Sequence, residues 1–521
     1  MHKYEKEINN LIKNNSQQFN KIYISSQIKF ERILESIFKN NENFELIFIN
    51  PHFNKNIYLS DTYTEFCKIE FIKSLNIKIK QKKELTEYIL NTKKINGKFY
   101  NLKKFLKILI YLIFFIVSKF YFKRKSIKNE ITLVDTYLTD DMFKSNKFIN
   151  KYYINTNLIK ENKKIFFLPV VLIKKGYFKK IKIIKSNNLN YIFPFDVLSI
   201  YEIISVIFFS KNFLKVRYPP KVMKYQYFFQ SRIKNDLFNG QIIISRIIYL
   251  TMKKLKEKKV IIKKSINWYE NQSKDKCFNY SVKTFHDASE VLSYKSIFSD
   301  NDYSIHLLPS NNEYKKKYYP DVIFTNSYGD LIHKKINKLM IPLKIGPLGR
   351  FKNIKFVNFK KNQKNDKNIL VVLPIDYKIS NNIINLIINF TKINKEYNFF
   401  FKLHPETSFY NKFYKIINEN NNFFIIKNNI TKLLTQFNTV ITNGSSVAVE
   451  AYFHFKNIII SSYDEERINN PLKYYGYKKC YIANNVNDLK KVLIHIKTVK
   501  IKYIYNKKIS LFYNKTISCN L

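Results

Sequence analysis

The stretch Thr442-Asn443-Gly444-Ser445-Ser446-Val447-Ala448-Val449-Glu450-Ala451 places a glycine and two serines between an apolar run, residues 437–441, and an alanine-bearing segment. This order predicts a strand, a tight turn and the start of a helix. Glycine is scarce elsewhere, at 8 of 521 residues, so its use here marks a turn that the backbone requires. A helix that begins after such a turn directs unpaired N–H groups and its positive dipole end at an anion. The stretch therefore predicts an α/β unit that binds a phosphate-bearing ligand.

A second motif, Lys402-Leu403-His404-Pro405-Glu406, follows another apolar run at 399–401. If both runs are strands of one parallel sheet, His404 and the serine pair lie at the same edge of that sheet. Ligands of open α/β sheets bind at the carboxyl ends of the strands. We therefore expect the two loops to hold one ligand.

Short apolar runs alternate with helix-like segments over most of the chain, which predicts parallel α/β structure. Runs at 131–135, 165–171 and 190–194, with a helix at 197–209, indicate a first Rossmann-like domain. A second series begins near residue 368, with strands expected at 368–373, 398–403, 423–426, 439–442 and 457–461, and helices at 381–393 and 445–453.

Residues 341–350 hold two of the 8 glycines and two of the 12 prolines, which indicates an interdomain linker. The expected fold is α/β, with two Rossmann-like domains facing a cleft and an N-terminal, mainly helical extension. The expected division of the chain is 1–125 (helical extension), 126–340 (first domain, on the acceptor side), 341–350 (linker), 351–500 (second domain, for the nucleotide donor) and 501–521 (C-terminal tail).

One segment of the extension leaves two interpretations open. Residues 108–118 are uncharged, and lysines flank them on both sides; widening the segment to 105–122 adds two lysines. Eleven residues of helix span about 16 Å, well short of the ~30 Å hydrocarbon core of a bilayer. The segment is either a helix lying in a membrane interface, with its lysines at the headgroups, or a buried core helix.

The formal net charge of +52 raises the question of nucleic-acid binding. Only seven of the 91 basic residues are arginine, and the abundant Lys, Asn, Ile, Phe and Tyr all have A/T-rich codons. A dedicated nucleic-acid binder favours arginine, whose planar fork reads phosphate and guanine. We therefore expect no specific nucleic-acid partner, although attraction to anionic membrane surfaces remains.

The four cysteines, Cys67, Cys277, Cys480 and Cys519, have no paired spacing, which fits a reducing compartment and predicts no zinc site. The N-terminal residues are polar and lack a signal-peptide core. We expect a cytoplasmic protein, with a peripheral location on the inner face of the cytoplasmic membrane left open.

The motifs KLHPE (402–406) and TNGSSVAVEA (442–451) resemble the His-Pro and Ser-Ser motifs of inverting glycosyltransferases of the GT-B fold. Bacterial sialyl-, polysialyl- and Kdo-type transferases, which use CMP-sugars, share this pattern. Three further pieces resemble a narrower group of bacterial surface-carbohydrate (capsule or O-antigen) biosynthesis proteins: SINWYENQSKDK (265–276), LLPSNNEY (307–314) and PDVIFTNSYGD (320–330). The narrower likeness covers about residues 260–460 and the general one about 365–465.

The resemblance implies that His404 contacts the phosphate of a nucleotide-sugar donor. Gly444, Ser445 and Ser446 would bind the same phosphate, although one serine could be an ordinary helix cap. Pro405 would set the backbone of its loop.

Two carboxylates would complete the donor site. Glu450 could accept hydrogen bonds from ribose hydroxyls, or it could be a solvated helix residue. Asp376, in the loop that follows the first strand of the second domain, would face the cleft or form a plain surface turn.

For the general base we favour Glu270, because a carboxylate beside the indole of Trp268 can lose its hydration and gain basicity. Asp135 is its rival, and Asp321 and Asn326 border another candidate loop. A sialyltransferase-type acidic motif is not clearly present, so the base and the sugar stay open.

No cofactor or metal is expected, and the nucleotide-sugar is a substrate. The acceptor would be a surface polysaccharide or a lipid-linked glycan. The alternatives are a CDP-polyol phosphotransferase or nucleotide-sugar epimerase on the same fold, and a non-catalytic adaptor for glycan assembly or export.

Overall fold

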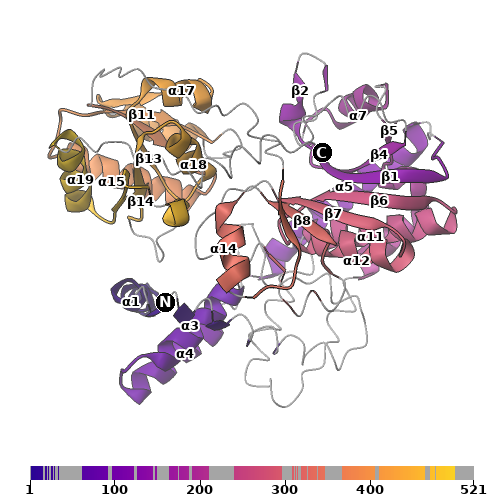
Figure 1. Cartoon of the computed structure of the whole chain (residues 1–521), viewed down its shortest axis with the longest axis horizontal. Helices are drawn as coiled ribbons and strands as arrows, with labels where there is room; N and C mark the ends of the chain where they lie inside the picture. Colours follow the sequence, from indigo (N-terminus) through magenta and orange to yellow (C-terminus); the bar gives the residue numbers. More distant parts are fainter. Residues whose placement is uncertain are drawn as a thin grey trace.

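The computed structural model of the chain contains two α/β domains and a group of N-terminal helices (Figure 1). Three of these helices, α1 (His2–Asn14), α3 (Thr62–Ser74) and α4 (Ile79–Asn91), pack around Ile12, Phe66 and Phe71. The structure describes residues 2–15, 62–91, 97–122, 126–144, 164–173, 175–186, 190–209, 240–295, 318–325, 327–336, 338–346, 367–404, 410–463, 470–475 and 477–498, together with single residues and pairs between them. The tail at 501–521 lies outside the described residues.

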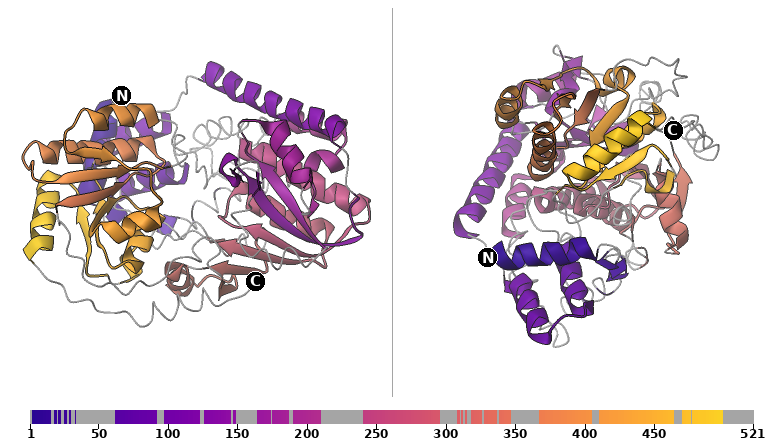
Figure 2. Two further views of the ribbon diagram at one scale, coloured as in Figure 1. Left: turned by 90° about the horizontal axis from the view of Figure 1, so that it is seen from above. Right: turned by 90° about the vertical axis from the view of Figure 1, so that its left-hand side faces the viewer.

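The long helix α5 (Gly97–Tyr121) packs on the first α/β domain. Its residues Ile108, Leu112 and Phe115 join the buried cluster of that domain. In Figure 2, left, α5 lies along the outer edge of the molecule. In the part of the chain that the structure describes, a helix long and apolar enough to cross a bilayer is not found.

The first domain is built on a seven-stranded parallel sheet. Its strands are β1 (Glu130–Leu138), β4 (Ile165–Val171), β5 (Asn190–Tyr191), β6 (Ile261–Trp268), β7 (Glu290–Lys295), β8 (Val322–Thr325) and β9 (Leu343–Ile345). Its helices are α7 (Tyr177–Ser186), α8 (Pro194–Val197), α9 (Ile200–Phe209), α11 (Gly240–Glu257), α12 (Ser273–Phe285) and α14 (Tyr328–Ile336). The short helix η2 (Asp140–Met142) leads into the hairpin of β2 (Phe143–Lys144) and β3 (Lys147–Phe148).

Alternate residues of β1 explain how this sheet is covered on both faces. Val134 and Leu138 enter the cluster shared with α5, α7 and α9, whereas Ile131 and Leu133 enter the cluster shared with α11 and α12. Successive side chains of a strand point to opposite faces, so a strand covered on both sides carries apolar residues on both faces. In β1 these residues stand at odd and even positions, and the buried Asp135 and Thr136 interrupt them.

The second domain is a six-stranded parallel sheet. Its strands are β10 (Asn368–Val372), β11 (Asn398–Lys402), β12 (Phe423–Ile425), β13 (Thr439–Thr442), β14 (Asn457–Ser461) and β15 (Cys480–Ala483). Its helices are α15 (Tyr377–Thr391), α16 (Tyr410–Asn418), α17 (Ile430–Gln436), α18 (Ser446–Phe453), η7 (Lys473–Tyr475) and α19 (Val486–Thr498).

Both sheets have the strand order of a Rossmann fold. The first is β5-β4-β1-β6-β7-β8-β9 and the second is β12-β11-β10-β13-β14-β15, so in each the fourth strand of the sheet pairs with the first. The direction of winding reverses between those two strands, and ligands of such sheets bind at that switch point. The expected α/β class with two Rossmann-like domains is confirmed. That the two sheets face a common cleft stays a prediction.

The segment 341–350, expected to be a linker, requires correction in its first half. Residues Leu343–Ile345 form β9, the last strand of the first sheet, which pairs with β8. Gly346 follows β9, and a Cβ atom placed on it would lie 2.4 Å from the Cβ of Phe324. Gly346, one of the two glycines behind the linker prediction, therefore allows close packing between neighbouring strands.

The helix predicted at 197–209 begins later than expected. Leu198 and Ser199 separate α8 from α9, and the strand expected at 190–194 ends before Pro194, the first residue of α8. Proline suits the first position of a helix because its missing N–H has no partner to lose there.

The two α/β domains touch through α14 and η7. The ring of Tyr328, the first residue of α14, lies 6.4 Å from the ring of Tyr475, and His333 meets Tyr474 edge to face at 5.3 Å. Tyr328 also packs on the buried cluster under α18. These aromatic contacts join the carboxyl end of β8, through the helix that follows it, to the second domain.

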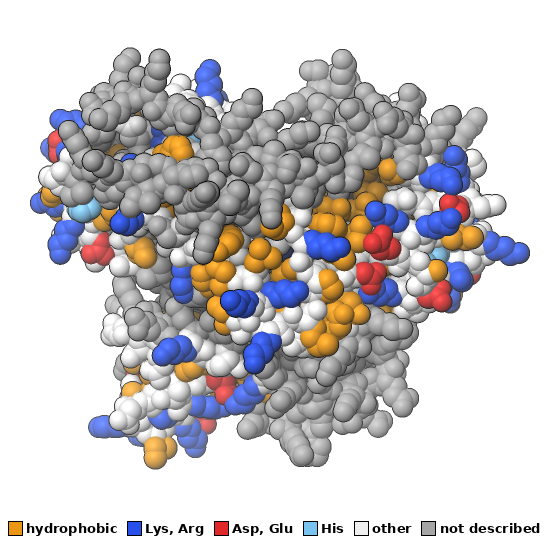
Figure 3. Space-filling view, viewed as in Figure 1, with side chains coloured by type: hydrophobic (Ala, Val, Ile, Leu, Met, Phe, Trp, Pro, Cys, Tyr) orange, Lys and Arg blue, Asp and Glu red, His pale blue; other side chains and the backbone are white. Residues whose placement is uncertain are grey.

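On the face drawn in Figure 3, the described Lys and Arg side chains are scattered rather than gathered into one stripe. A groove that follows a nucleic-acid backbone needs a concentrated basic path. The scatter on this face fits a charge that comes from composition.

Candidate functional site

Three strands of the second sheet end at the same level, at its switch point. In the register of the sheet, Val372 of β10 pairs with Lys402 of β11, and Val371 pairs with Ile441 of β13. The hydroxyl of Thr442, the last residue of β13, donates to the carbonyl of Val372 at 3.1 Å. The loops that follow these three strands therefore leave the sheet from one edge and one level.

The glycine–serine turn gives α18 an open N-terminus. Ser445 occupies the cap position with an extended backbone (φ −88°, ψ 157°), but among the described residues its side chain makes no capping bond. Its hydroxyl instead lies 3.0 Å from that of Thr442. Gly444, Ser445 and Ser446 are only partly buried. The N–H of Ala448 donates to the carbonyl of Ser445 at 3.1 Å, so among the described residues the N–H groups of Ser446 and Val447, with the two serine hydroxyls, remain for an anion.

The remainder of this turn is fixed by packing. Ala448 and Ala451 are fully buried in the core beneath α18, which explains why this segment carries alanines. The side-chain amide of Asn443 donates to the carbonyl of Ser461 at 2.9 Å and ties the turn to β14. A rigid turn of this kind holds its N–H groups in place before a ligand arrives.

His404 lies two residues beyond the end of β11 and is partly buried. Since β10 separates β11 from β13, the two strand ends are roughly 10 Å apart at the usual spacing of parallel strands. An imidazole and a helix N-terminus can reach one phosphate from the two sides of that gap. The structure brings His404 and the serine pair to the same edge, and Pro405 lies outside the described residues.

Asp376 and Glu450 are both largely buried, at 5% and 7% exposure. The carboxylate of Asp376 accepts a hydrogen bond from the backbone N–H of Ile379 at 2.8 Å and thereby caps α15. Glu450 lies in the second turn of α18 and is not the solvated helix residue of the alternative interpretation. Contact of either carboxylate with a donor stays a prediction.

Glu270 lies at the switch point of the first sheet, two residues after β6. Its carboxylate accepts hydrogen bonds from the indole N–H of Trp268 at 3.3 Å and from the side-chain amide of Gln272 at 2.7 Å. Glu270 is partly exposed. Two donors thus orient a carboxylate that solvent can still reach.

The backbone beyond Glu270 turns sharply at Asn271, which has a positive φ of 56°. Asparagine tolerates this left-handed conformation better than most residues. Its side chain accepts from the hydroxyl of Tyr269 at 2.8 Å and donates to the carbonyl of Leu308 at 3.1 Å. The WYENQ sequence is therefore a turn that presents Glu270.

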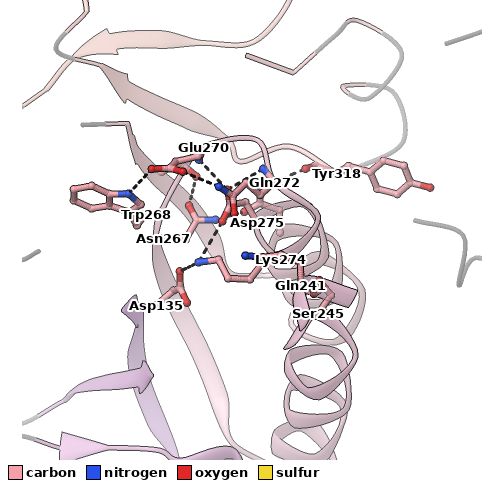
Figure 4. Close-up of polar contacts among 12 residues, drawn as sticks. Asp135, Gln241, Ser245, Asn267, Trp268, Glu270, Gln272, Lys274, Asp275 and Tyr318 are labelled. Atoms are coloured by element: carbon pink, nitrogen blue, oxygen red, sulfur yellow. Dashed lines mark hydrogen bonds and ion pairs between the residues drawn. The ribbon is translucent and has the colours of Figure 1, made fainter. Parts of the chain in front are cut away.

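Asp275 holds the same turn in place through hydrogen bonds to its backbone (Figure 4). Its Oδ2 accepts from the backbone N–H groups of Glu270, at 2.8 Å, and Gln272, at 3.1 Å. Burial raises the pKa of the Asp275 carboxyl to about 6, although the ammonium of Lys274 and the N–H of Glu270 act to lower it. The carboxyl is a structural cap that can titrate near neutral pH.

Asp135, the rival candidate for the base, forms a buried ion pair with Lys274, and both side chains are 0% exposed. Burial alone would lower the pKa of Lys274, but the negative charge of Asp135, with Tyr137 and Asp275, holds it well above its ordinary value. A paired and fully buried carboxylate does not meet an acceptor hydroxyl. Asp135 is part of the support beneath Glu270.

Asp321 also proves to be structural. It precedes β8, so it lies at the amino end of that strand, the edge opposite to the switch-point loops. Its carboxylate accepts from Lys283 Nζ at 2.7 Å and from the backbone N–H of Val291 at 2.8 Å. Asn326 lies outside the described residues.

Sequence reasoning missed a second buried pair, between Lys295 at the end of β7 and Asp330 in α14. Lys295 Nζ lies 2.6 Å from Asp330 Oδ2, and the same oxygen accepts from the hydroxyl of Thr325 at 2.6 Å. This network fixes the start of the helix that touches the second domain. The motif PDVIFTNSYGD held Thr325 and Asp330, but nothing in the sequence pointed to Lys295 as their partner.

No protein-family model and no curated protein sequence matches the chain. Solved structures with similar architecture include the S. aureus MnaA–UDP co-structure, at 10% identity over 75% of this chain and 92% of that one, with a TM-score of 0.39. The UDP-GlcNAc 2-epimerase from Neisseria meningitidis bound to UDP-GlcNAc has 12% identity over 75% of this chain and 95% of that one, with a TM-score of 0.38. Phytolacca americana UGT2 complexed with UDP-2fluoro-glucose and pterostilbene has 12% identity over 75% of this chain and 94% of that one, with a TM-score of 0.39. These scores are low, so the fold assignment here rests on the strand orders themselves.

Proposed function

We propose that the chain is an inverting glycosyltransferase that moves a sugar from a nucleotide donor, with CMP as the nucleotide, to a surface polysaccharide or lipid-linked glycan. The observation that carries this proposal is the common level of the three strand ends in the second sheet. Because the strands end at one level, His404 and the N-terminus of α18 can bind the same anionic group. The resemblance of the two motifs to those of CMP-sugar transferases supports a capsule or O-antigen product.

The donor half of the reaction uses the second domain. Backbone N–H groups and the hydroxyls of Ser445 and Ser446 stabilise the charge that develops on the departing phosphate. His404 donates a hydrogen bond to the same phosphate or protonates it as it leaves. One helix N-terminus and one imidazole suit a single phosphate, which favours a CMP donor over a diphosphate. For the same reason the proposal includes no metal ion or other cofactor.

The acceptor half uses Glu270. Its carboxylate takes the proton from the acceptor hydroxyl as that oxygen bonds to the anomeric carbon, and the bond from the anomeric carbon to the phosphate oxygen breaks. The nucleotide departs with the electron pair of that bond. Attack from the face opposite to the leaving group inverts the anomeric centre. The scattered cysteines fit a reducing compartment, so we place the reaction in the cytoplasm.

The test is calorimetric titration of the full chain with CMP, CDP and UDP, together with the Ser445→Ala/Ser446→Ala variant. We expect CMP to bind and the double variant to bind it about tenfold or more weakly. With a CMP-sugar donor and a glycan acceptor, turnover should fall about 10²-fold or more. Thr435→Ala, an exposed hydroxyl on α17 of the same domain, is the matched control and should change neither quantity.

Each contrary result points to a different alternative. Binding of UDP alone overturns the CMP assignment, and release of an epimerised nucleotide-sugar without transfer identifies an epimerase. Transfer of a polyol phosphate from a CDP donor identifies a phosphotransferase. A folded chain that binds no nucleotide is an adaptor. Normal turnover in the folded double serine variant removes the phosphate site proposed here.

A further inference from the structure

Helix α5 has two apolar faces, and only one of them is covered. Ile108, Leu112 and Phe115 are buried in the first domain. The opposite side carries a second stripe at helical spacing that faces solvent: Leu106 (48% exposed), Ile110 (54%), Ile113 (56%), Val117 (43%) and Phe120 (72%). A surface helix ordinarily places polar residues on that side. The stripe runs about 21 Å along the helix at 1.5 Å per residue.

Helix α9 extends this apolar area, since it packs beside α5. It carries its own exposed apolar positions at Tyr201, Ile204 and Phe208, again at helical spacing. Its one acid, Glu202, is held by the Ser199 cap and by Lys254. We refer to the exposed apolar residues of α5 and α9 as the α5–α9 surface.

The charge around α5 has one sign. Between Glu87 and Glu130 the chain has eleven lysines and arginines and not one acidic residue. Lys119, the one lysine between Ile108 and Phe122, lies on the inner side of α5 and donates to the carbonyl of Phe195 at 3.3 Å. Charge is thus kept off the apolar stripe and is placed in the sequence on either side of it. Apolar residues bordered by cations match a layer of anionic headgroups over acyl chains.

The packing of α5 decides how it would meet such a layer. Ile108, Leu112 and Phe115 belong to the core of the first domain, so the helix cannot enter a bilayer end-on without exposing that core. Only its outer face is free to enter the interface. Figure 2, left, shows this helix at the edge of the molecule, along the outside of the first domain.

We propose that the α5–α9 surface docks the first domain flat on an anionic phospholipid bilayer. The apolar stripe enters the headgroup–acyl boundary, and the flanking lysines and arginines pair with lipid phosphates. The occupant is the lipid surface itself, because the same-sign charge would repel a second copy of this chain at the same place. Docking requires no nucleotide, so its test is independent of the proposed reaction.

The test is co-sedimentation of the full chain with vesicles of phosphatidylcholine containing phosphatidylglycerol, and with vesicles of pure phosphatidylcholine. We expect preferential binding to the anionic vesicles that weakens with salt. The variant Ile110→Gln/Ile113→Gln/Val117→Gln should lower the partition coefficient about tenfold or more, because three exposed apolar side chains that the bilayer would bury are lost. Tyr201→Gln/Phe208→Gln, which leaves α5 intact, should lower it by a smaller factor.

The matched control is Ile336→Gln/Ile393→Gln/Ile494→Gln, three exposed isoleucines elsewhere, at 66%, 68% and 49% exposure. It should bind like the wild type, which shows that the loss is local to the α5–α9 surface. Circular dichroism and size-exclusion chromatography establish that every variant is folded. The proposal is overturned if the wild type ignores anionic vesicles or if the α5 variant binds them equally well. It also fails if the wild type is a dimer that the α5 variant dissociates without any change in vesicle binding.

Discussion

Lys274→Met should destabilise the first α/β domain by about 3–5 kcal/mol, the usual cost of removing one partner of a buried ion pair. The structure places this substitution at the upper end of that range. The Lys274 ammonium contacts Asp135, lies 3.2 Å from Asp275 Oδ1 and sits 4.3 Å from the centroid of the Tyr137 ring. Methionine fills a similar volume but leaves two buried carboxylates without their shared cation.

The assay is urea unfolding followed by tryptophan fluorescence. Trp268 is the only tryptophan of the chain, and it is buried at the end of β6, beside Glu270. Its emission therefore reports the first domain alone, which avoids treating a multidomain chain as two-state. Lys164→Met is the matched control, because Lys164 is 59% exposed where it pairs with Glu130 and should contribute about 1 kcal/mol or less.

A double-mutant cycle isolates the pair itself. Asp135→Leu alone should also be costly, but the double variant Asp135→Leu/Lys274→Met should be more stable than the two single losses predict, by about 2 kcal/mol or more. If the losses of unfolding free energy in the two single variants simply add in the double variant, or if Lys274→Met lowers that free energy by less than about 1 kcal/mol, the two charges do not stabilise each other.

Two further predictions use the same fluorescence readout. The pKa of Asp275 is raised to about 6, so the folded state binds a proton more tightly than the unfolded state, and the contribution of this carboxyl to the unfolding free energy should fall by up to about 3 kcal/mol as pH rises from about 4 to 6. Asp275→Asn should remove that part of the slope from a plot of unfolding free energy against pH, and an unchanged slope would contradict the assignment. Gly346→Ala should cost about 1–3 kcal/mol, because its Cβ would lie 2.4 Å from Phe324 Cβ and force β8 and β9 apart. Gly240→Ala, with nothing within 4 Å of its added Cβ, is the control, and equal midpoints for the two variants would be the contrary outcome.

The second domain was the most predictable part of the chain. The strand expected at 457–461 has those bounds in the structure, and the run at 439–442 is β13. Both strands lie inside a parallel sheet covered on two faces, so burial leaves an uninterrupted apolar signal. The predicted start of α15 was four residues late, because the cap formed by Asp376 was not recognised.

The boundary between α8 and α9 shows a signal that was present but not used. Ser199 and Glu202 form a reciprocal cap, with Glu202 N donating to Ser199 Oγ at 3.1 Å and Ser199 N donating to Glu202 Oε2 at 2.6 Å. The spacing Ser-x-x-Glu is a known helix start. The ion pair between Asp135 and Lys274, which lies beneath Glu270, has no such sequence signal, because its two residues are 139 positions apart and meet only in the folded domain. Long-range pairs of this kind cannot be inferred from one sequence.

The two sheets differ in what lies between their first and fourth strands, and this difference supports the proposal that the second domain binds the donor. In the first sheet, Asp135 of β1 pairs with Lys274 of the helix after β6, so the gap between the first and fourth strands is filled by the protein's own cation and anion. In the second sheet, the gap is bridged by one hydroxyl, from Thr442 to the carbonyl of Val372. At the helix N-terminus beside that bridge, Ser445, Ser446 and Val447 are only partly buried. A phosphate would have to displace a buried ion pair in the first domain, whereas in the second it meets donors already in place.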